Sequence, residues 1–172
     1  MRTIAIIALT GILPSPAFAQ SLDARAAQAI VAGCSAHATT KQQSHAIAVV
    51  DVGGNLVAAL RMDGNGSGIM DFSLAKAKAV ASWGFSTAQM EENAKGTPGF
   101  ANAPHVVTVA GGVPVWSADG KTRIGGVGAS GEAPADDAAC AEAGPRSPPP
   151  APAGSLEGFS GPPCRVRKSP RR

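Results

Sequence analysis

At 172 residues the chain has room for one domain, and its 21 Gly, 14 Pro and absence of Tyr are unusual for a globular protein. Its net charge of +3 is uneven, because residues 145–172 carry six Arg and Lys against one Glu, whereas residues 20–144 carry eight basic and eleven acidic side chains. This distribution argues against a specific nucleic-acid partner for the folded part, and the lack of an apolar run of ~20 residues beyond residue 19 excludes an integral membrane protein.

Both ends of the chain differ in composition from the middle. Met1 and Arg2 precede an apolar stretch from Ile4 to Leu13 and then the segment PSPAFA, an order typical of a secretory signal peptide. We therefore expect cleavage after Ala19 and a periplasmic or secreted protein. Residues 145–172 are rich in Pro and Arg and have no apolar periodicity, which predicts a disordered basic tail. The domain is expected over residues 20–144.

Apolar spacing predicts a helix, a hairpin and a second helix in the first half of the domain. Residues 22–38 place small and apolar side chains three and four positions apart, as an amphipathic helix does. Two β-type runs, residues 46–52 and 56–62, flank a Gly-Gly-Asn turn and predict an antiparallel hairpin. Apolar residues between 69 and 83 mark one face of an alanine-rich helix.

The second half is predicted to return to strands and to end in a helix. A short helix is expected over residues 86–95, followed by strands at 106–109, 113–116 and 122–127. Pro134 suits the first turn of a last helix that ends at Gly144. The order of these elements predicts an α+β fold with an antiparallel sheet.

A glycine-rich segment precedes the last helix. Residues 126–131 match G-x-G-x-x-G, but no further βαβ unit follows, so we reject a dinucleotide-binding site. The exposed amides of a glycine loop at a helix start can still hold an anion such as a carboxylate. That loop comprises Gly126, Gly128, Ser130 and Gly131. The alternative is a tight turn that needs glycine for backbone reasons alone.

Few side chains offer chemistry for catalysis or metal binding. No nucleophile elbow is present, and no histidine has metal-site spacing with another His or with Cys, so an exposed or capping role is the default for His37, His45 and His105. Lys76 is expected to reach solvent, or to have a lowered pKa if it is buried. The five aromatic residues of the domain all lie between positions 72 and 116, where they form either an aromatic core or the lining for a flat apolar ligand.

The cysteines leave two interpretations open. Export implies an oxidising compartment, in which Cys34 and Cys140 of the domain can form a bridge. Two buried free thiols are an equally good interpretation, because a separation of 106 positions does not decide the matter. Cys164 lies in the tail and is left over in either case.

Several short motifs resemble those of the GlcG/HbpS-like haem-binding family, which has a DUF336-type domain. In chain order they are VDVGGNLV from Val50, RMDG from Arg61, AKA from Ala75, GGVPV from Gly111, and IGGVGASG from Ile124, followed by Asp136 and Cys140. They occur in the family's order over about residues 22–144. The resemblance implies a profilin-like fold, with an antiparallel sheet of about five strands flanked by helices, and a chain that self-associates.

The resemblance also implies an exported, non-enzymatic haem-binding or haem-related accessory protein. His105 is our first choice as axial ligand of the haem iron and Met62 our second, because imidazole and thioether both ligate haem iron. Phe72, Lys76 and Trp83 are expected to contact the haem. One alternative is a small-carboxylate binder or accessory enzyme of hydroxy-acid utilisation that uses the glycine loop. Another is an oligomeric scaffold that binds no ligand.

Overall fold

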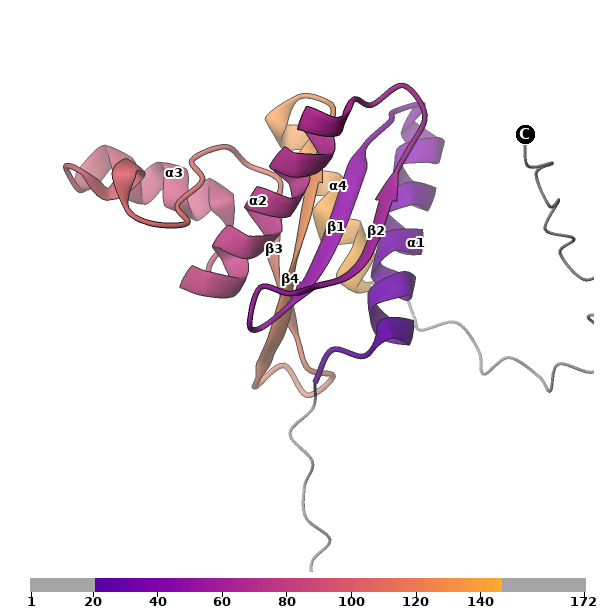
Figure 1. Cartoon of the computed structure of the whole chain (residues 1–172), viewed down its shortest axis with the longest axis horizontal. Coiled ribbons are helices and arrows are strands. Elements are labelled where there is room, and N and C mark those ends of the chain that lie inside the picture. Colours follow the sequence, from indigo (N-terminus) through magenta and orange to yellow (C-terminus); the bar gives the residue numbers. More distant parts are fainter. Residues whose placement is uncertain (1–20, 147–172) are drawn as a thin grey trace, which may run out of the picture.

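Residues 21–146, the part of the chain described by the computed structural model, form an antiparallel sheet with helices on both faces (Figure 1). The strands are β1 (Ala46–Asp51), β2 (Leu56–Arg61), β3 (Gly112–Trp116) and β4 (Arg123–Ser130), in the order β2-β1-β4-β3. Every neighbouring pair is antiparallel. The predicted α+β fold is confirmed, with four strands in residues 21–146 instead of about five. The predicted signal peptide and the predicted tail from residue 147 onward lie outside the described residues, and residues 145 and 146 belong to the last helix.

The β1–β2 hairpin turns at the predicted Gly-Gly-Asn sequence. The Asp51 carboxylate accepts hydrogen bonds from the backbone amides of Gly53 and Asn55, each at 2.9 Å. Gly54 has φ of 77°, a conformation that favours glycine. The hydrogen bonds, led by that of the Asn55 amide, hold the pKa of Asp51 below its ordinary value. The turn is therefore stabilised by its own side chain.

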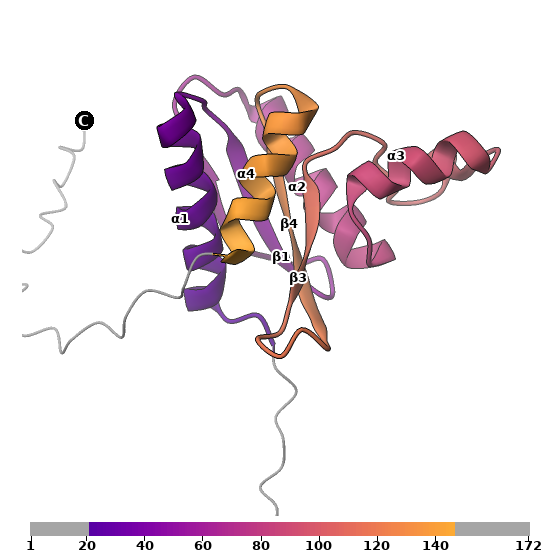
Figure 2. The ribbon, with the colours of Figure 1, turned by 180° about the vertical axis from the view of Figure 1, so that it is seen from behind.

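Helices cover the two faces of the sheet unequally. α1 (Ala24–Lys41) and α4 (Pro134–Arg146) lie side by side on one face, and α2 (Ser67–Trp83) lies on the other (Figures 1 and 2). The first face encloses a cluster of buried residues that includes Ile47, Val49 and Val127. The second encloses a smaller cluster of Ala48, Val50, Ala77 and Ala81. The buried side chains are mostly Ala and Val, so helices and sheet approach closely.

The predicted glycine loop is part of strand β4, so that prediction was wrong. Gly126 and Gly128 pair with β1 on one side and β3 on the other, and α2 packs directly over them. A Cβ atom added at Gly126 would lie 2.7 Å from the Ala77 carbonyl oxygen, and one at Gly128 would collide with the Ser73 carbonyl oxygen. Glycine is required here for close packing of a helix on a strand, and the strand's amides are used by the sheet.

The segment between α2 and β3 projects from the sheet as an arm (Figures 1 and 2). It contains α3 (Thr87–Gly96), whose first turn is capped by the Ser86 side chain, and η1 (Phe100–Asn102), one turn of 3-10 helix. Residues 106–109 form no strand, contrary to the prediction. The valines there are half-buried, and they pair with none of the four strands of residues 21–146, so β propensity alone did not make a strand.

A disulfide joins the two helices of the first face. Cys34 of α1 and Cys140 of α4 are bonded, with Cα atoms 4.6 Å apart and 106 positions between them in the chain. The bridge decides between the two interpretations of these cysteines. It ties α4, which ends at Arg146 instead of Gly144, to the beginning of the domain. No helix within residues 21–146 combines the length and hydropathy needed to cross a membrane.

Candidate functional site

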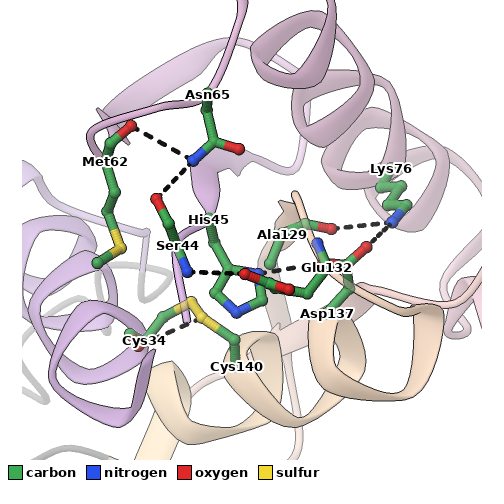
Figure 3. Close-up of polar contacts among 10 residues, drawn as sticks. All are labelled: Cys34, Ser44, His45, Met62, Asn65, Lys76, Ala129, Glu132, Asp137 and Cys140. Atoms are coloured by element: carbon green, nitrogen blue, oxygen red, sulfur yellow. Dashed lines mark hydrogen bonds and ion pairs between the residues drawn. A yellow bond between two sulfur atoms is a disulfide. The ribbon is translucent and has the colours of Figure 1, made fainter. Parts of the chain in front are cut away.

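Three ionisable side chains from different segments meet inside the domain, where β1 begins and β4 ends (Figure 3). Lys76 Nζ of α2 donates to Asp137 Oδ2 of α4 at 2.8 Å. His45 Nδ1, one residue before β1, lies 3.1 Å from Asp137 Oδ1. Lys76 and His45 are fully buried, and Asp137 is 3% exposed. A charged cluster therefore occupies a position that apolar side chains usually fill.

Lys76 is held by three different kinds of contact. Its Nζ atom donates to the Ala129 carbonyl oxygen at 2.9 Å in addition to Asp137, and it lies 4.8 Å from the centre of the Phe72 ring. A Cβ at Gly111 would lie 2.6 Å from Nζ, so glycine at that position leaves room for the ammonium group. The expectation that Lys76 reaches solvent was wrong. Burial lowers its pKa, and the hydrogen bond and charge of Asp137 oppose that shift.

Asp137 accepts hydrogen bonds from several donors and organises the cluster. Besides Lys76 and His45, the backbone amide of Glu132 donates to its Oδ1 atom at 3.1 Å. The Glu132 carboxylate accepts in turn from the amide of Ser44 at 3.0 Å. Asp137 is not among the site residues predicted from the sequence. Its pairing with Lys76 connects residues 61 positions apart, which sequence spacing does not indicate.

His45 is not an exposed or capping residue, so the default prediction was wrong for it. When its Nδ1 atom donates to Asp137, Nε2 is a buried acceptor with no hydrogen-bond partner among residues 21–146. The position directly before a strand gave no indication of burial. The sequence also provided no indication that Ser130 is buried. Ser130 is 1% exposed, and its hydroxyl has no hydrogen-bond partner among residues 21–146.

Three of the aromatic residues, Trp83, Phe85 and Phe100, contact one another at the end of α2, and they do not form a core. Trp83 lies 5.2 Å from Phe100 and 6.2 Å from Phe85, measured between ring centres. None of the five aromatic side chains of residues 21–146 is buried, and Phe72, Trp83 and Trp116 are exposed. The aromatic-core alternative is therefore wrong, because Ala, Val and Ile fill the interior instead.

The structure brings His105 close to this aromatic group and leaves Met62 elsewhere. The Trp83 indole nitrogen donates to the Pro104 carbonyl oxygen at 3.0 Å, which fixes the residue before His105 against α2. His105 is exposed and has φ of 60°. Met62 packs against the buried cluster on the α1/α4 face. The two predicted iron ligands thus belong to opposite layers.

Of the predicted cofactor contacts, Phe72 and Lys76 touch each other, and Trp83 lies further along α2. Of the predicted anion loop, Gly126, Gly128 and Ser130 lie in β4, and Gly131 directly follows it. Within residues 21–146, no group of three or more His, Cys, Asp or Glu residues is arranged to hold a metal ion.

A model of the family described as "Haem degrading protein HbpS-like" matches residues 22–146. The chain belongs to this HbpS-like family. Among solved structures, HbpS is 27% identical with a TM-score of 0.67, and the match covers 81% of this chain and 96% of HbpS. A Klebsiella pneumoniae protein, ORFY, described as DUF336, is 26% identical with a TM-score of 0.68, covering 78% and 95% of the two chains.

A third structure with this fold contains haem. PduOC in complex with haem is 22% identical with a TM-score of 0.66, and the match covers 73% of this chain and 94% of PduOC. At this level of identity the likeness shows the shared fold alone. No curated protein sequence matches the chain. The family, whose description names haem degradation, is what relates this chain to haem.

Proposed function

We propose that this chain is an exported, non-enzymatic haem-binding protein that holds haem against α2 and the segment containing His105. The observation that carries the proposal is its relation to HbpS, with 27% identity over 96% of the HbpS chain. Membership of a family described as haem degrading gives the ligand class. The proposal differs from that description in assigning binding without turnover to this chain.

The side chains on this part of the surface suit haem. Phe72 and Trp83, 37% and 38% exposed, lie on the same helix and offer apolar surface to a flat ligand. His105 is exposed, directly follows the Pro104 carbonyl that Trp83 contacts, and remains our first choice as axial ligand. The half-buried Met62 side chain packs against the cluster on the α1/α4 face, away from α2, which makes it the weaker choice. When bound, haem supplies an iron centre with affinity for imidazole.

Titration of the purified full-length chain with hemin tests this proposal. We expect a Soret band shifted from that of free hemin. His105→Ala should weaken or shift that band, whereas His37→Ala, a matched change of a half-buried histidine on α1, should leave it unchanged. A wild-type spectrum identical to free hemin would contradict the proposed function. Equal effects of the two variants would contradict the choice of His105.

The non-enzymatic part requires a separate experiment. The hemin complex is incubated in air with ascorbate as reductant, and the Soret band is followed beside free hemin under the same conditions. Binding without turnover predicts that the protein slows the loss of the band. Faster loss together with release of iron would show haem degradation and contradict this part of the proposal. Export is tested by mass spectrometry of the N-terminus after expression, with cleavage expected after Ala19.

Self-association belongs to the same proposal. Val52, Leu56 and Trp116 are apolar side chains with between 48% and 55% of their surface exposed in the single chain. Exposed apolar surface favours contact with a second copy. Sedimentation velocity is expected to give a mass of at least two chains, and a single monomeric species at micromolar concentration would contradict it.

A further inference from the structure

We propose that Lys76 binds a carboxylate group of the ligand and that the Phe72 ring covers Lys76 until the ligand arrives. This carboxylate has two possible sources. One is a propionate of haem, for which the inference rests on the proposed function, and the other is a free small carboxylic acid. Both present the same chemistry to an ammonium group, and the experiments below separate them.

The Lys76 ammonium has one donor direction that the interior does not use. A lysine ammonium has three N–H donors. Two of them are directed to Asp137 Oδ2 at 2.8 Å and to the Ala129 carbonyl oxygen at 2.9 Å. On the remaining side lies the face of Phe72, 4.8 Å from Nζ to the ring centre. A ring face is a weaker partner for an ammonium group than a carboxylate oxygen.

The Asp137 carboxylate is not the partner of Lys76 alone. It is shared among Lys76, the His45 imidazole and the Glu132 amide. The imidazole and the amide therefore stabilise the Asp137 charge in addition to the ammonium group. Lys76 therefore remains an electrostatic partner for a second carboxylate, in a site of low water content where such a contact is strong.

Phe72 is placed to act as a movable cover. Lys76 is fully buried, whereas Phe72 is 37% exposed and belongs to neither buried cluster of residues 21–146. Its ring takes no part in the aromatic contacts among Trp83, Phe85 and Phe100. Rotation of this ring exchanges a cation–π contact for a charge-assisted hydrogen bond to the ligand and leaves the core packing unchanged.

The first experiment compares hemin with hemin dimethyl ester, in which both propionates are blocked, on the full-length chain. We expect the wild type to bind the ester about tenfold more weakly, the loss of one charge-assisted hydrogen bond. Lys76→Met should bind hemin as weakly as the ester. Lys78→Met is the matched control, because Lys78 is an exposed lysine of the same helix, and it should behave as wild type.

A second pair of variants leaves Lys76 in place, so that the test does not depend on the folding of Lys76→Met. In Phe72→Glu the new carboxylate can occupy the position beside Lys76 that the ligand would take. It should weaken binding of hemin about tenfold. Ile69→Glu adds the same charge one turn earlier on α2, at a side chain that is 36% exposed, and should bind like wild type.

Calorimetry with glycolate identifies the source of the carboxylate. Discrimination between hemin and its ester that disappears in Lys76→Met assigns the site to a haem propionate. Glycolate binding that disappears in Lys76→Met, without any hemin binding, supports the Lys76 site and overturns the proposed haem function. Equal hemin and ester binding in the wild type and in Phe72→Glu overturns the Lys76 site and leaves haem binding standing. Binding of neither ligand overturns both.

Discussion

The α1/α4 layer and the arm from residue 84 to residue 111 are built in opposite ways. The layer contains a disulfide and a cluster of buried apolar residues, and its Asp137 forms an ion pair with Lys76 of α2. The arm projects from the sheet (Figure 2). Its aromatic rings at the junction with α2 are partly exposed. Because exposed rings and an exposed imidazole contribute little to the core, we assign stability to the layer and ligand contact to the side of α2 next to the arm.

This contrast also explains why so little of the interior is aromatic. Small side chains let α2 pack directly on the glycines of β4. The interface between this helix and the sheet is therefore filled without aromatic rings. The aromatic residues are then available for surface contacts. Each prediction below tests one side of the contrast, in order of decreasing expected effect.

Asp137→Ala should have the largest effect on stability. It leaves the Lys76 ammonium buried without its counterion, which costs about 3–5 kcal/mol of unfolding free energy. Asp136→Ala, at the neighbouring half-buried position, should cost less than about 1 kcal/mol. Urea unfolding at neutral pH measures both. Equal losses in the two variants would show that the cluster does not stabilise the layer.

The same variant has a predicted pH dependence. Burial lowers the pKa of Lys76 below its ordinary 10.5, so between the lowered and the ordinary value the folded chain binds fewer protons than the unfolded chain. Unfolding free energy therefore rises with pH in that window. The deficit of Asp137→Ala relative to wild type should shrink as the pH approaches 10.5, because Lys76 then becomes neutral. A constant deficit would contradict the assignment to a buried charge.

Removing the disulfide should have the next largest effect. Cys34→Ala with Cys140→Ala is expected to lower unfolding free energy by about 2–4 kcal/mol, because the bridge closes a loop of more than a hundred residues in the unfolded chain. The hemin spectrum should be unchanged, since the bridge belongs to the α1/α4 layer. An altered hemin spectrum in a folded variant would indicate that the ligand contacts the α1/α4 layer, and would contradict its placement beside α2.

Gly128→Ala should cost about 1–3 kcal/mol, because the added methyl group meets the backbone of α2 at Ser73 and Ala77. Gly68→Ala is the control, since its methyl group would meet nothing within 4 Å and alanine favours a helix. We expect thermal denaturation to show a loss for the first and no loss for the second. A neutral Gly128→Ala would mean that close packing does not require this glycine.

Trp83→Phe should have the smallest effect on stability, about 1 kcal/mol or less, because it removes one exposed hydrogen bond to Pro104. Its effect should be local instead. Amide hydrogen exchange is expected to speed up around residues 104–106 and to stay unchanged in α1 and α4. Faster exchange throughout the chain would show that the arm and the layer unfold together.

Most of the fold could be predicted from the sequence, because its signals are local. Gly53 and Gly54 indicate the hairpin, Ser86 the start of α3, and Pro134 the start of α4. The predicted strand at residues 106–109 failed, since valine propensity says nothing about an available partner strand. The resemblance to the HbpS-like family, carried by short motifs in order, was confirmed.

The candidate site could be predicted only in part, because its contacts are long-range. Lys76 and Phe72 were expected near a ligand, but the burial of Lys76 depends on Asp137, 61 positions later. His45 was missed because a histidine before a strand is usually solvated. The glycines of β4 were read as a loop, since a glycine that packs under a helix and one that makes a turn look alike in sequence.

Hydrogen–deuterium exchange of the full-length chain with and without hemin tests the central claim most directly. If the ligand contacts α2 and the arm, hemin should slow amide exchange around residues 68–76 and 103–111. Exchange in α1 and α4 should stay unchanged. Protection confined to α1 and α4, or no protection anywhere despite a shifted Soret band, would contradict it.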